Sequence, residues 1–218
     1  MTFKKYFAFI FFSAFLFFNE GYSQSIGVLF EGTSFNINNL FYRNSYSMNG
    51  MIKNIFINYN SSLGSHFTIA ARAGYGWHNI ENVYKIGEEE SVNKENIEGF
   101  PIETEIKYKH FIGTDSVFEP TIGLGAGYYN YITKLKSSPS NGIEFTTKGF
   151  AQYITFGMNV HISEIIMSNI QFKKIMLNNI STKENKGDSS SEVDYVQGSG
   201  INDLSISLGI FYKLNTGD

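Results

Sequence analysis

One histidine and one serine have the spacing of a general base and a nucleophile. His161 and Ser163 are two residues apart, and residues at i and i+2 lie on the same face of a β-strand. In such a strand the His161 imidazole can activate the Ser163 hydroxyl for attack. The acidic neighbour Glu164 would lie on the opposite face. The pair is a candidate for nucleophilic chemistry if these residues form a strand.

Other patterns contain residue types found in binding sites but lack the spacing that those sites need. Gly123, Gly125 and Gly127 resemble a phosphate loop, yet Tyr128 stands where a dinucleotide site needs glycine, and no helix is expected to follow. The four histidines have no metal-ligand spacing and the chain has no cysteine. The acidic run 88–90 is typical of a solvated loop. No metal site and no cofactor are predicted.

Composition excludes several classes of protein. Charged residues make up 17% of the 218 residues and aromatic residues another 17%, which excludes a disordered chain. The absence of cysteine excludes a disulfide scaffold. A net charge of -3 argues against non-specific nucleic-acid binding, so no nucleic-acid partner is expected.

The N-terminal segment is typical of a secretory signal. Lys4 and Lys5 precede an apolar run at 6–18, and Gly21 and Ser23 supply small residues for cleavage before Gln24. Thirteen apolar residues are too few to cross a bilayer, which needs about 20. We expect residues 1–23 to be removed as a signal peptide and residues 24–218 to form the mature domain.

Hydrophobic alternation predicts β-strands in that domain. From Leu204 to Leu214 every second residue is apolar, and a period of two separates two faces of a strand. Weaker or equal alternation recurs in seven other segments, at 26–31, 54–59, 67–78, 100–109, 118–128, 150–162 and 166–176. The chain is therefore expected to contain eight strands.

The links between these segments alternate in length. Short links are expected near 62–66, 112–117 and 163–164, and long polar links at 36–50, 81–97, 133–148 and 178–200. Tight turns at one end and long loops at the other are typical of outer-membrane barrels. We predict an all-β fold, an eight-stranded antiparallel up-and-down transmembrane β-barrel.

Aromatic residues favour a membrane barrel over a soluble, exported, lipocalin-like carrier. Phe67 and Trp77 bracket one apolar face, as do Phe118 and Tyr128. Ten tilted residues rise about 25 Å, the height of an apolar band between two aromatic girdles. Tyr59, Tyr108 and Tyr212 would join the periplasmic girdle, and Phe100 and Phe150 the outer one. A carrier remains the alternative if the apolar faces point inward.

At this level the chain resembles the outer-membrane barrels related to OmpA and OmpX. The resemblance is one of architecture over residues 25–214, together with one terminal motif. Residues 207–214 match that family's assembly signal through Ser207, Gly209, Tyr212 and Leu214, although four residues follow it. The resemblance implies recognition by the barrel-assembly machinery, contact with outer-membrane lipid and lipopolysaccharide, a monomer, and location in the outer membrane.

The residues expected to face the barrel interior carry nearly balanced charge. An eight-stranded barrel is filled by side chains, and unpaired charges inside it are costly. We expect a closed lumen filled by a structural charge network. Its predicted members are Glu31, Arg72, Glu103, Glu105, Lys107, Lys109, Glu119, Lys173 and Asp203.

These features predict a non-enzymatic structural or surface-interaction protein that acts through its external loops, since function on scaffolds concentrates in loops. No sequence motif in the predicted external loops identifies a binding partner. The alternative is a hydrolase, because the His161-any-Ser163 element resembles that of outer-membrane lipid A deacylases. The predicted topology opposes this alternative, since it places His161 at the periplasmic end while the lipid substrate lies in the outer leaflet.

Overall fold

The computed structural model describes residues 23–38, 47–86, 89–110, 117–137, 143–185 and 200–215. Residues 1–22 of the predicted signal and the centres of the predicted external links lie outside these ranges. The described residues contain no helix long and apolar enough to cross a membrane. They form almost entirely β-strand.

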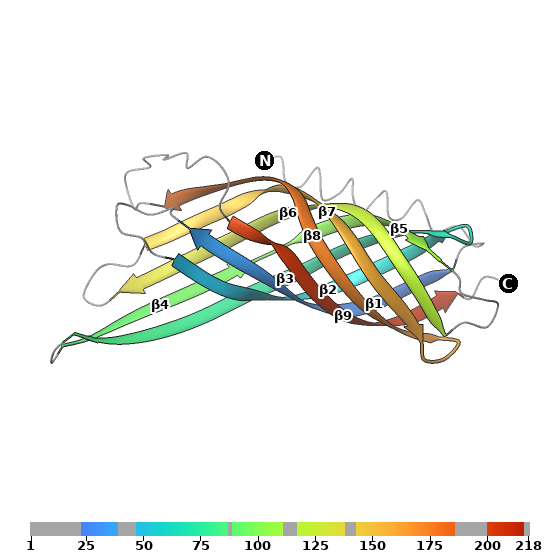
Figure 1. Cartoon of the computed structure of the whole chain (residues 1–218), viewed down its shortest axis with the longest axis horizontal. Helices are drawn as coiled ribbons and strands as arrows, with labels where there is room; N and C mark the ends of the chain where they lie inside the picture. The colour runs from blue at the N-terminus through green and yellow to red at the C-terminus, as the bar shows by residue number, and fades with distance from the viewer. Residues whose placement is uncertain are drawn as a thin grey trace.

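Nine strand segments make up one antiparallel sheet (Figure 1). They are β1 (Gln24–Asn38), β2 (Ser47–Leu63), β3 (Phe67–Ile86), β4 (Glu89–Gly99), β5 (Ile102–Lys109), β6 (Phe118–Ser137), β7 (Ile143–His161), β8 (Ile166–Asn185) and β9 (Gly200–Asn215). β4 and β5 both lie between β3 and β6, so they are two halves of one spanning strand. The break falls at Pro101, which has no N–H to donate to the ladder.

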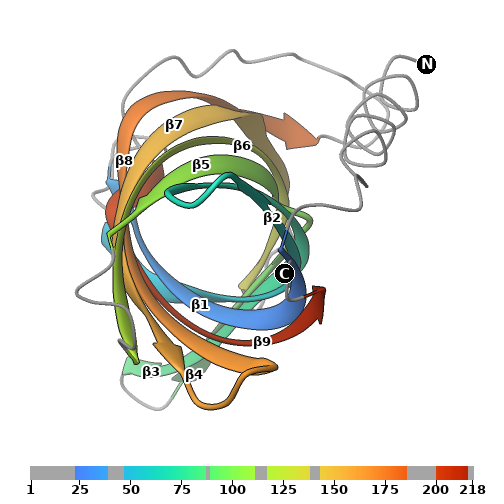
Figure 2. The ribbon, with the colours of Figure 1, turned by 90° about the vertical axis from the view of Figure 1, so that its right-hand side faces the viewer.

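The sheet closes into a barrel of eight spanning strands. Ile26 of β1 pairs with Tyr59 of β2 on one side and with Tyr212 of β9 on the other. The end view in Figure 2 shows the strands as a ring. Closure leaves no free sheet edge over the paired stretch, as a strand structure in lipid requires. The predicted all-β barrel is confirmed.

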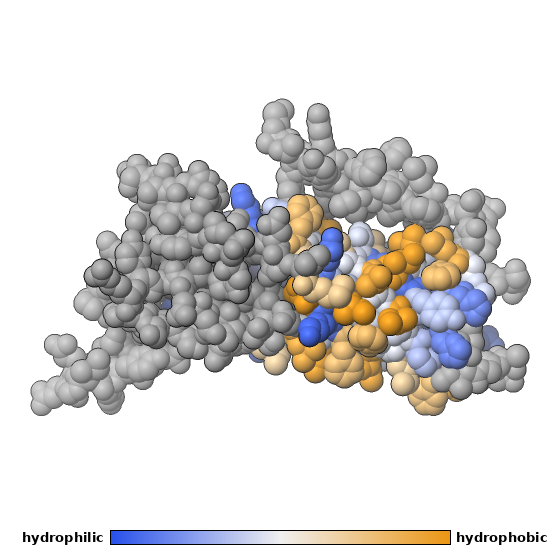
Figure 3. Space-filling model, turned by 45° about the horizontal axis from the view of Figure 1, so that its top comes forward, coloured by the Kyte–Doolittle hydropathy of each residue, from blue (hydrophilic) through white to orange (hydrophobic). Residues whose placement is uncertain are grey.

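The orientation of the side chains separates a membrane barrel from a soluble one. Large apolar side chains face outward: Phe30 is 57% exposed, Ile210 65% and Phe150 65%. The side chains buried inside are largely polar or charged. Figure 3 shows the hydrophobic residues gathered on the outer wall. A lipocalin-like carrier needs the reverse arrangement, so that alternative is wrong.

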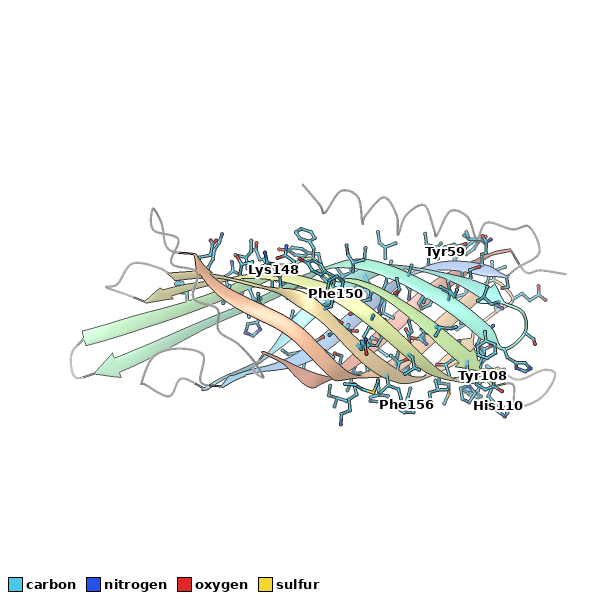
Figure 4. All side chains as sticks on the ribbon, turned by 90° about the horizontal axis from the view of Figure 1, so that it is seen from above. Tyr59, Tyr108, His110, Lys148, Phe150 and Phe156 are labelled. Atoms are coloured by element: carbon cyan, nitrogen blue, oxygen red, sulfur yellow. The ribbon has the colours of Figure 1, made fainter. Side chains whose placement is uncertain are left out.

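Aromatic side chains mark both borders of the apolar wall. Toward the short turns, Phe67 and Tyr108 pack edge to face with ring centroids 5.5 Å apart. Toward the other end, Tyr128 and Phe150 lie 5.0 Å apart. Figure 4 shows Tyr59 and Tyr108 near the short-turn end, with Phe150 and Lys148 farther along the wall. This arrangement matches the two predicted girdles.

The predicted link at 81–97 is wrong in extent. β3 continues to Ile86 and β4 begins at Glu89. The two strands are paired through this region, from Asn79 with Asn96 to Ile86 with Glu89. The other three long links also give several residues to the adjoining strands. The ladder continues because backbone hydrogen bonds between strands do not need apolar side chains. The alternation of apolar and polar residues, by contrast, is expected only where the outer face of a strand contacts lipid.

Candidate functional site

The centre of the lumen holds a four-residue charge cluster drawn from four strands. Lys173 on β8 donates to Glu31 on β1 over 2.7 Å and to Glu103 on β5 over 2.8 Å. Glu103 also forms an ion pair with Arg72 on β3. All four residues are at least 96% buried. Each buried charged group forms an ion pair with a group of opposite charge. An unpaired charge would be strongly destabilising in these low-dielectric surroundings.

Aromatic rings surround this cluster. The Arg72 guanidinium lies 5.3 Å from the Phe56 ring and 5.6 Å from the Tyr153 ring. Lys173 Nζ lies 5.3 Å from the same Tyr153 ring. Tyr129 donates its hydroxyl to Glu103 Oε1 over 2.6 Å. Cation–π contacts and the tyrosine hydrogen bond add to the ion pairs, so the cluster fills the middle of the barrel.

A second polar layer lies next to the central cluster, one step toward the short turns. Gln171 donates to both carboxylate oxygens of Glu105, over 2.9 and 3.2 Å. Thr155 donates to the same carboxylate. Lys107 Nζ lies 3.4 Å from Glu105 Oε2 and 3.5 Å from Gln171 Oε1. This layer extends the filling of the lumen.

The third group of polar residues lies at the short-turn mouth. Asn159 donates to Glu119 over 2.6 Å, and Asn169 donates to Asn159 over 2.7 Å. His161 Nε2 lies 3.7 Å from Glu119. Lys109 Nζ donates to Ser62 over 3.4 Å. The mouth is more open than the layers above it, since His161 and Lys109 are only half-buried.

The structure thus brings most of the predicted lumen residues together, in three layers. Glu31, Arg72, Glu103 and Lys173 form the central cluster, Glu105 and Lys107 the second layer, and Lys109 and Glu119 the mouth. Asp203 belongs to β9, but its side chain lies outside the part that the structure describes.

The predicted base and nucleophile are not brought together. His161 ends β7 and turns toward Glu119 inside the mouth. Ser163 lies in the exposed turn that follows, where its Oγ accepts the backbone N–H of Ile166 over 3.1 Å. Both residues lie at the short-turn end. The geometry offers no activated serine at this position.

The residues of the predicted assembly signal alternate across β9. Ser207 and Gly209 face the lumen, whereas Tyr212 and Leu214 are about half exposed on the outer wall. Ser207 donates to the Gln171 carbonyl over 3.4 Å. The outward pair therefore presents an aromatic and an aliphatic side chain at the short-turn rim.

Sequence reasoning missed several neutral members of the network. Tyr129 and Tyr131 point inward, and Tyr131 donates to Asn54 over 3.1 Å. Gln171 bonds both Glu105 and Lys107. Asn159 joins Glu119 to Asn169. Their positions follow from alternation, because each is one residue away from an outward apolar residue. A search restricted to charged residues passes over them.

Comparison with known proteins identifies the fold. Neither the scan of protein-family models nor the search of curated proteins finds a match. Among solved structures, Ail, the attachment invasion locus protein of Yersinia pestis, aligns with a TM-score of 0.53 at 9% identity, covering 88% of this chain and 99% of that chain. Neisserial surface protein A aligns with a TM-score of 0.51 at 10% identity, covering 88% of this chain and 97% of that chain.

These likenesses agree with the inside-out distribution of polar and apolar side chains. They confirm, at the level of the fold, the resemblance that was inferred from the sequence. The chain has the fold of the eight-stranded outer-membrane β-barrels of the OmpA and OmpX type.

Proposed function

We propose that this protein is a small surface-interaction barrel of the outer membrane, which acts through its external end and keeps its lumen closed. The observation that carries this proposal is the central cluster. Glu31, Lys173, Glu103 and Arg72 connect β1, β8, β5 and β3 across the interior. With tyrosines packed against them, they would block passage through the interior, so that the external end is the part of the barrel available to molecules outside the cell.

The external end has the form of an interaction platform. β3 and β4 continue as a paired hairpin beyond the outer girdle to Ile86 and Glu89, and Figure 1 shows this hairpin protruding past the other strands. β6, β7 and β8 also extend beyond the girdle residues Tyr128 and Phe150. Rigid strands that lift loops off the membrane are a scaffold for recognition.

The comparison with Ail supports recognition at the surface. That barrel was solved in complex with the heparin analogue sucrose octasulfate. A barrel of this fold can therefore hold a ligand. For the present chain we propose recognition through its own loops, which differ in sequence.

An adhesion experiment tests this function. Cells that display the full chain are compared with cells that display a variant in which residues 39–46 and 186–199 are replaced by short Gly-Ser turns. We expect attachment to heparin-coated or protein-coated surfaces to fall in the variant. Equal surface amounts, measured by labelling of intact cells, are the control. Equal attachment of both to every surface would overturn the proposal.

Conductance recordings test the closed lumen. The purified barrel is reconstituted into planar bilayers. We expect no large, stable channel, because the charged and aromatic side chains occupy the interior. A large stable conductance from the native chain would overturn this part of the proposal.

The lipid A deacylase alternative gains no support from the geometry. Its nucleophile would be Ser163, whose Oγ accepts a backbone hydrogen bond in a turn, while His161 faces Glu119. We propose a non-enzymatic role. A change in lipid A acylation on expression of the chain that is lost in His161→Ala would overturn it.

A further inference from the structure

The ring of strands forks inside the apolar wall, between β8 and β9. These two strands are paired only as far as Lys174 with Leu204. Beyond this point β8 continues to Asn185 along β7, and β9, which starts at Gly200, lies along β1. Figure 1 shows β8 running away from the start of β9. Over the part of both strands that the structure describes, the edges that face each other across this fork therefore have no strand partner.

The fork begins below the outer aromatic girdle. Lys174 is paired with Ile154 of β7, which lies four residues from the girdle residue Phe150. Four residues of a strand tilted by about 40° rise about 10 Å. Phe172, on the same face of β8, is exposed toward the lipid. An open strand edge is costly in hydrocarbon unless its backbone groups find partners, so the fork favours an occupant with polar groups.

Two polar side chains face outward beside the fork. Lys174 on β8 and Gln152 on β7 are both exposed on the outer wall. They are diagonal neighbours, at a β-bulge that shifts the register between Gln152 and Tyr153. Among the described residues, no hydrogen bond or ion pair joins either side chain to another group. Because an ammonium group and an amide without partners are costly in hydrocarbon, the pair favours an anion together with a group that both donates and accepts hydrogen bonds.

We propose that the fork is a binding site for a phosphorylated glycolipid of the outer leaflet with amide-linked acyl chains, which is the chemistry of lipid A. Its phosphate accepts hydrogen bonds from the Lys174 ammonium group, since long basic side chains near a membrane interface direct their charge toward the headgroups. Its amide N–H donates to Gln152 Oε1, and its amide carbonyl accepts from Gln152 Nε2. Its acyl chains lie along the apolar wall beside Phe172. Without such a lipid, Lys174 remains a charge in an apolar wall.

Two other occupants fit this wall less well. A phospholipid supplies a phosphate, but its ester-linked chains have no N–H to donate to Gln152. A second copy of the chain would have to bring a carboxylate to Lys174. Of the described residues that face outward between the two girdles, none is acidic. The outward residues Glu98 and Glu144 lie beyond the outer girdle, opposite Ile132 and Lys134 of β6. The glycolipid is therefore the occupant whose groups match both polar side chains.

Native mass spectrometry of the refolded barrel tests the site. The chain without its predicted signal is refolded in an uncharged detergent. It is titrated separately with lipid A and with phosphatidylglycerol, which has a phosphate but no amide. We expect one lipid A molecule to bind per barrel, at least several-fold more tightly than phosphatidylglycerol. Absence of saturable lipid A binding would overturn the proposal. A dimer in place of the lipid adduct would assign the wall to a second copy and would overturn it as well.

Two variants assign the roles of the polar side chains. Lys174→Gln removes the ammonium group at the fork, and we expect the affinity for lipid A to fall about tenfold. Gln152→Leu removes the amide, and we expect it to reduce the preference for lipid A over phosphatidylglycerol. An unchanged preference in Gln152→Leu would overturn the role of the amide.

Lys53→Gln is the matched control. Lys53 also faces outward at the end of a ladder, that of β2 with β3, but it is paired with the girdle residue Trp77. Next to it His78 Nδ1 lies 2.9 Å from the Met51 carbonyl oxygen, so a side chain occupies this second fork. We expect Lys53→Gln to leave the affinity for lipid A unchanged. An equal loss in Lys174→Gln and Lys53→Gln would indicate general attraction to a basic wall and would overturn the proposal, whatever the role of the external loops.

Discussion

Lys173 and Glu103 meet across the lumen with Nζ and Oε1 2.8 Å apart, although 70 positions separate them in the sequence. They lie on β8 and β5, with two strands between them around the ring. The contact therefore crosses the interior and is not a neighbour contact along the wall. Because Lys173 also bonds Glu31 on β1, one ammonium group joins three separated strands.

Removal of this ammonium group should destabilise the barrel strongly. Lys173→Met keeps much of the side-chain volume but leaves Glu31 without its ion pair and Glu103 with only Arg72. Breaking a buried ion pair on one side costs about 3–5 kcal/mol. We expect a loss of that size in the free energy of unfolding, measured by denaturant titration of the refolded barrel.

A double variant serves as the control for Lys173→Met. Lys173→Met combined with Glu31→Gln removes the carboxylate that has lost its ion pair, so part of the lost stability should return. Lys174→Met, at the next position but on the outer wall, should show no comparable loss. A Lys173→Met barrel as stable as the native one would contradict the structural role of the network.

Gly125 and Tyr153 are predicted to be energetically coupled. A Cβ atom at Gly125 would collide with the Tyr153 ring, whose hydroxyl donates to the Thr104 carbonyl over 3.1 Å. Overpacking of this kind costs about 1–3 kcal/mol. We expect Gly125→Ala to lower the unfolding free energy by that amount.

The coupling is measured by a double-mutant cycle. Tyr153→Leu alone loses ring packing and is also destabilising. In the background of Tyr153→Leu, Gly125→Ala should cost much less, because the ring it meets is gone. If the effects of the two substitutions were additive, the contact between Gly125 and the Tyr153 ring would not account for the loss of stability in Gly125→Ala.

Alternation predicted the wall of the barrel well and the strand ends poorly. Outward residues such as Ile210 and Leu208 reveal their face because lipid selects apolar side chains at every second position. Beyond the girdles this selection weakens, so the paired stretch from Asn79 to Ile86 keeps the alternation only in part. Asn82 and Val83 interrupt it, and the sequence there resembles a polar loop. The strands remain paired there through their backbones, although the residue types no longer indicate a strand.

The candidate site shows the same division. The inward direction of Glu103, Glu105 and Lys173 follows from the alternation of each strand. Which of them meet depends on how far each strand is shifted against the next. Nothing local to Lys173 encodes the distance to Glu31, so the ion-pair partners could not be predicted from the sequence.

The rim residues of β9 offer a test of assembly that is separate from stability. Tyr212 and Leu214 face outward at the short-turn end, the side from which the assembly machinery would act by resemblance to other barrels. Tyr212→Ala should lower the amount of folded barrel in cells several-fold. The boiling-dependent gel shift of the extracted protein measures that amount. Ile210→Ala, two residues deeper in the wall, is the matched control. Equal losses for both would indicate a general stability effect.

Lys174 is predicted to lower the stability of the barrel in a lipid bilayer. It points outward from β8 between Phe172 and Met176, with Ile154 and Leu204 on the neighbouring strands. A lysine on the lipid face costs about 2–4 kcal/mol at the midplane and about 0–1 kcal/mol near the interfaces. We expect Lys174→Leu to raise the unfolding free energy in lipid vesicles by roughly 1 kcal/mol. Lys148→Leu should have little effect, because Lys148 lies two residues beyond Phe150, outside the apolar wall (Figure 4). A loss of stability in Lys174→Leu would mean that this ammonium group gains more from lipid headgroups than it loses to the hydrocarbon.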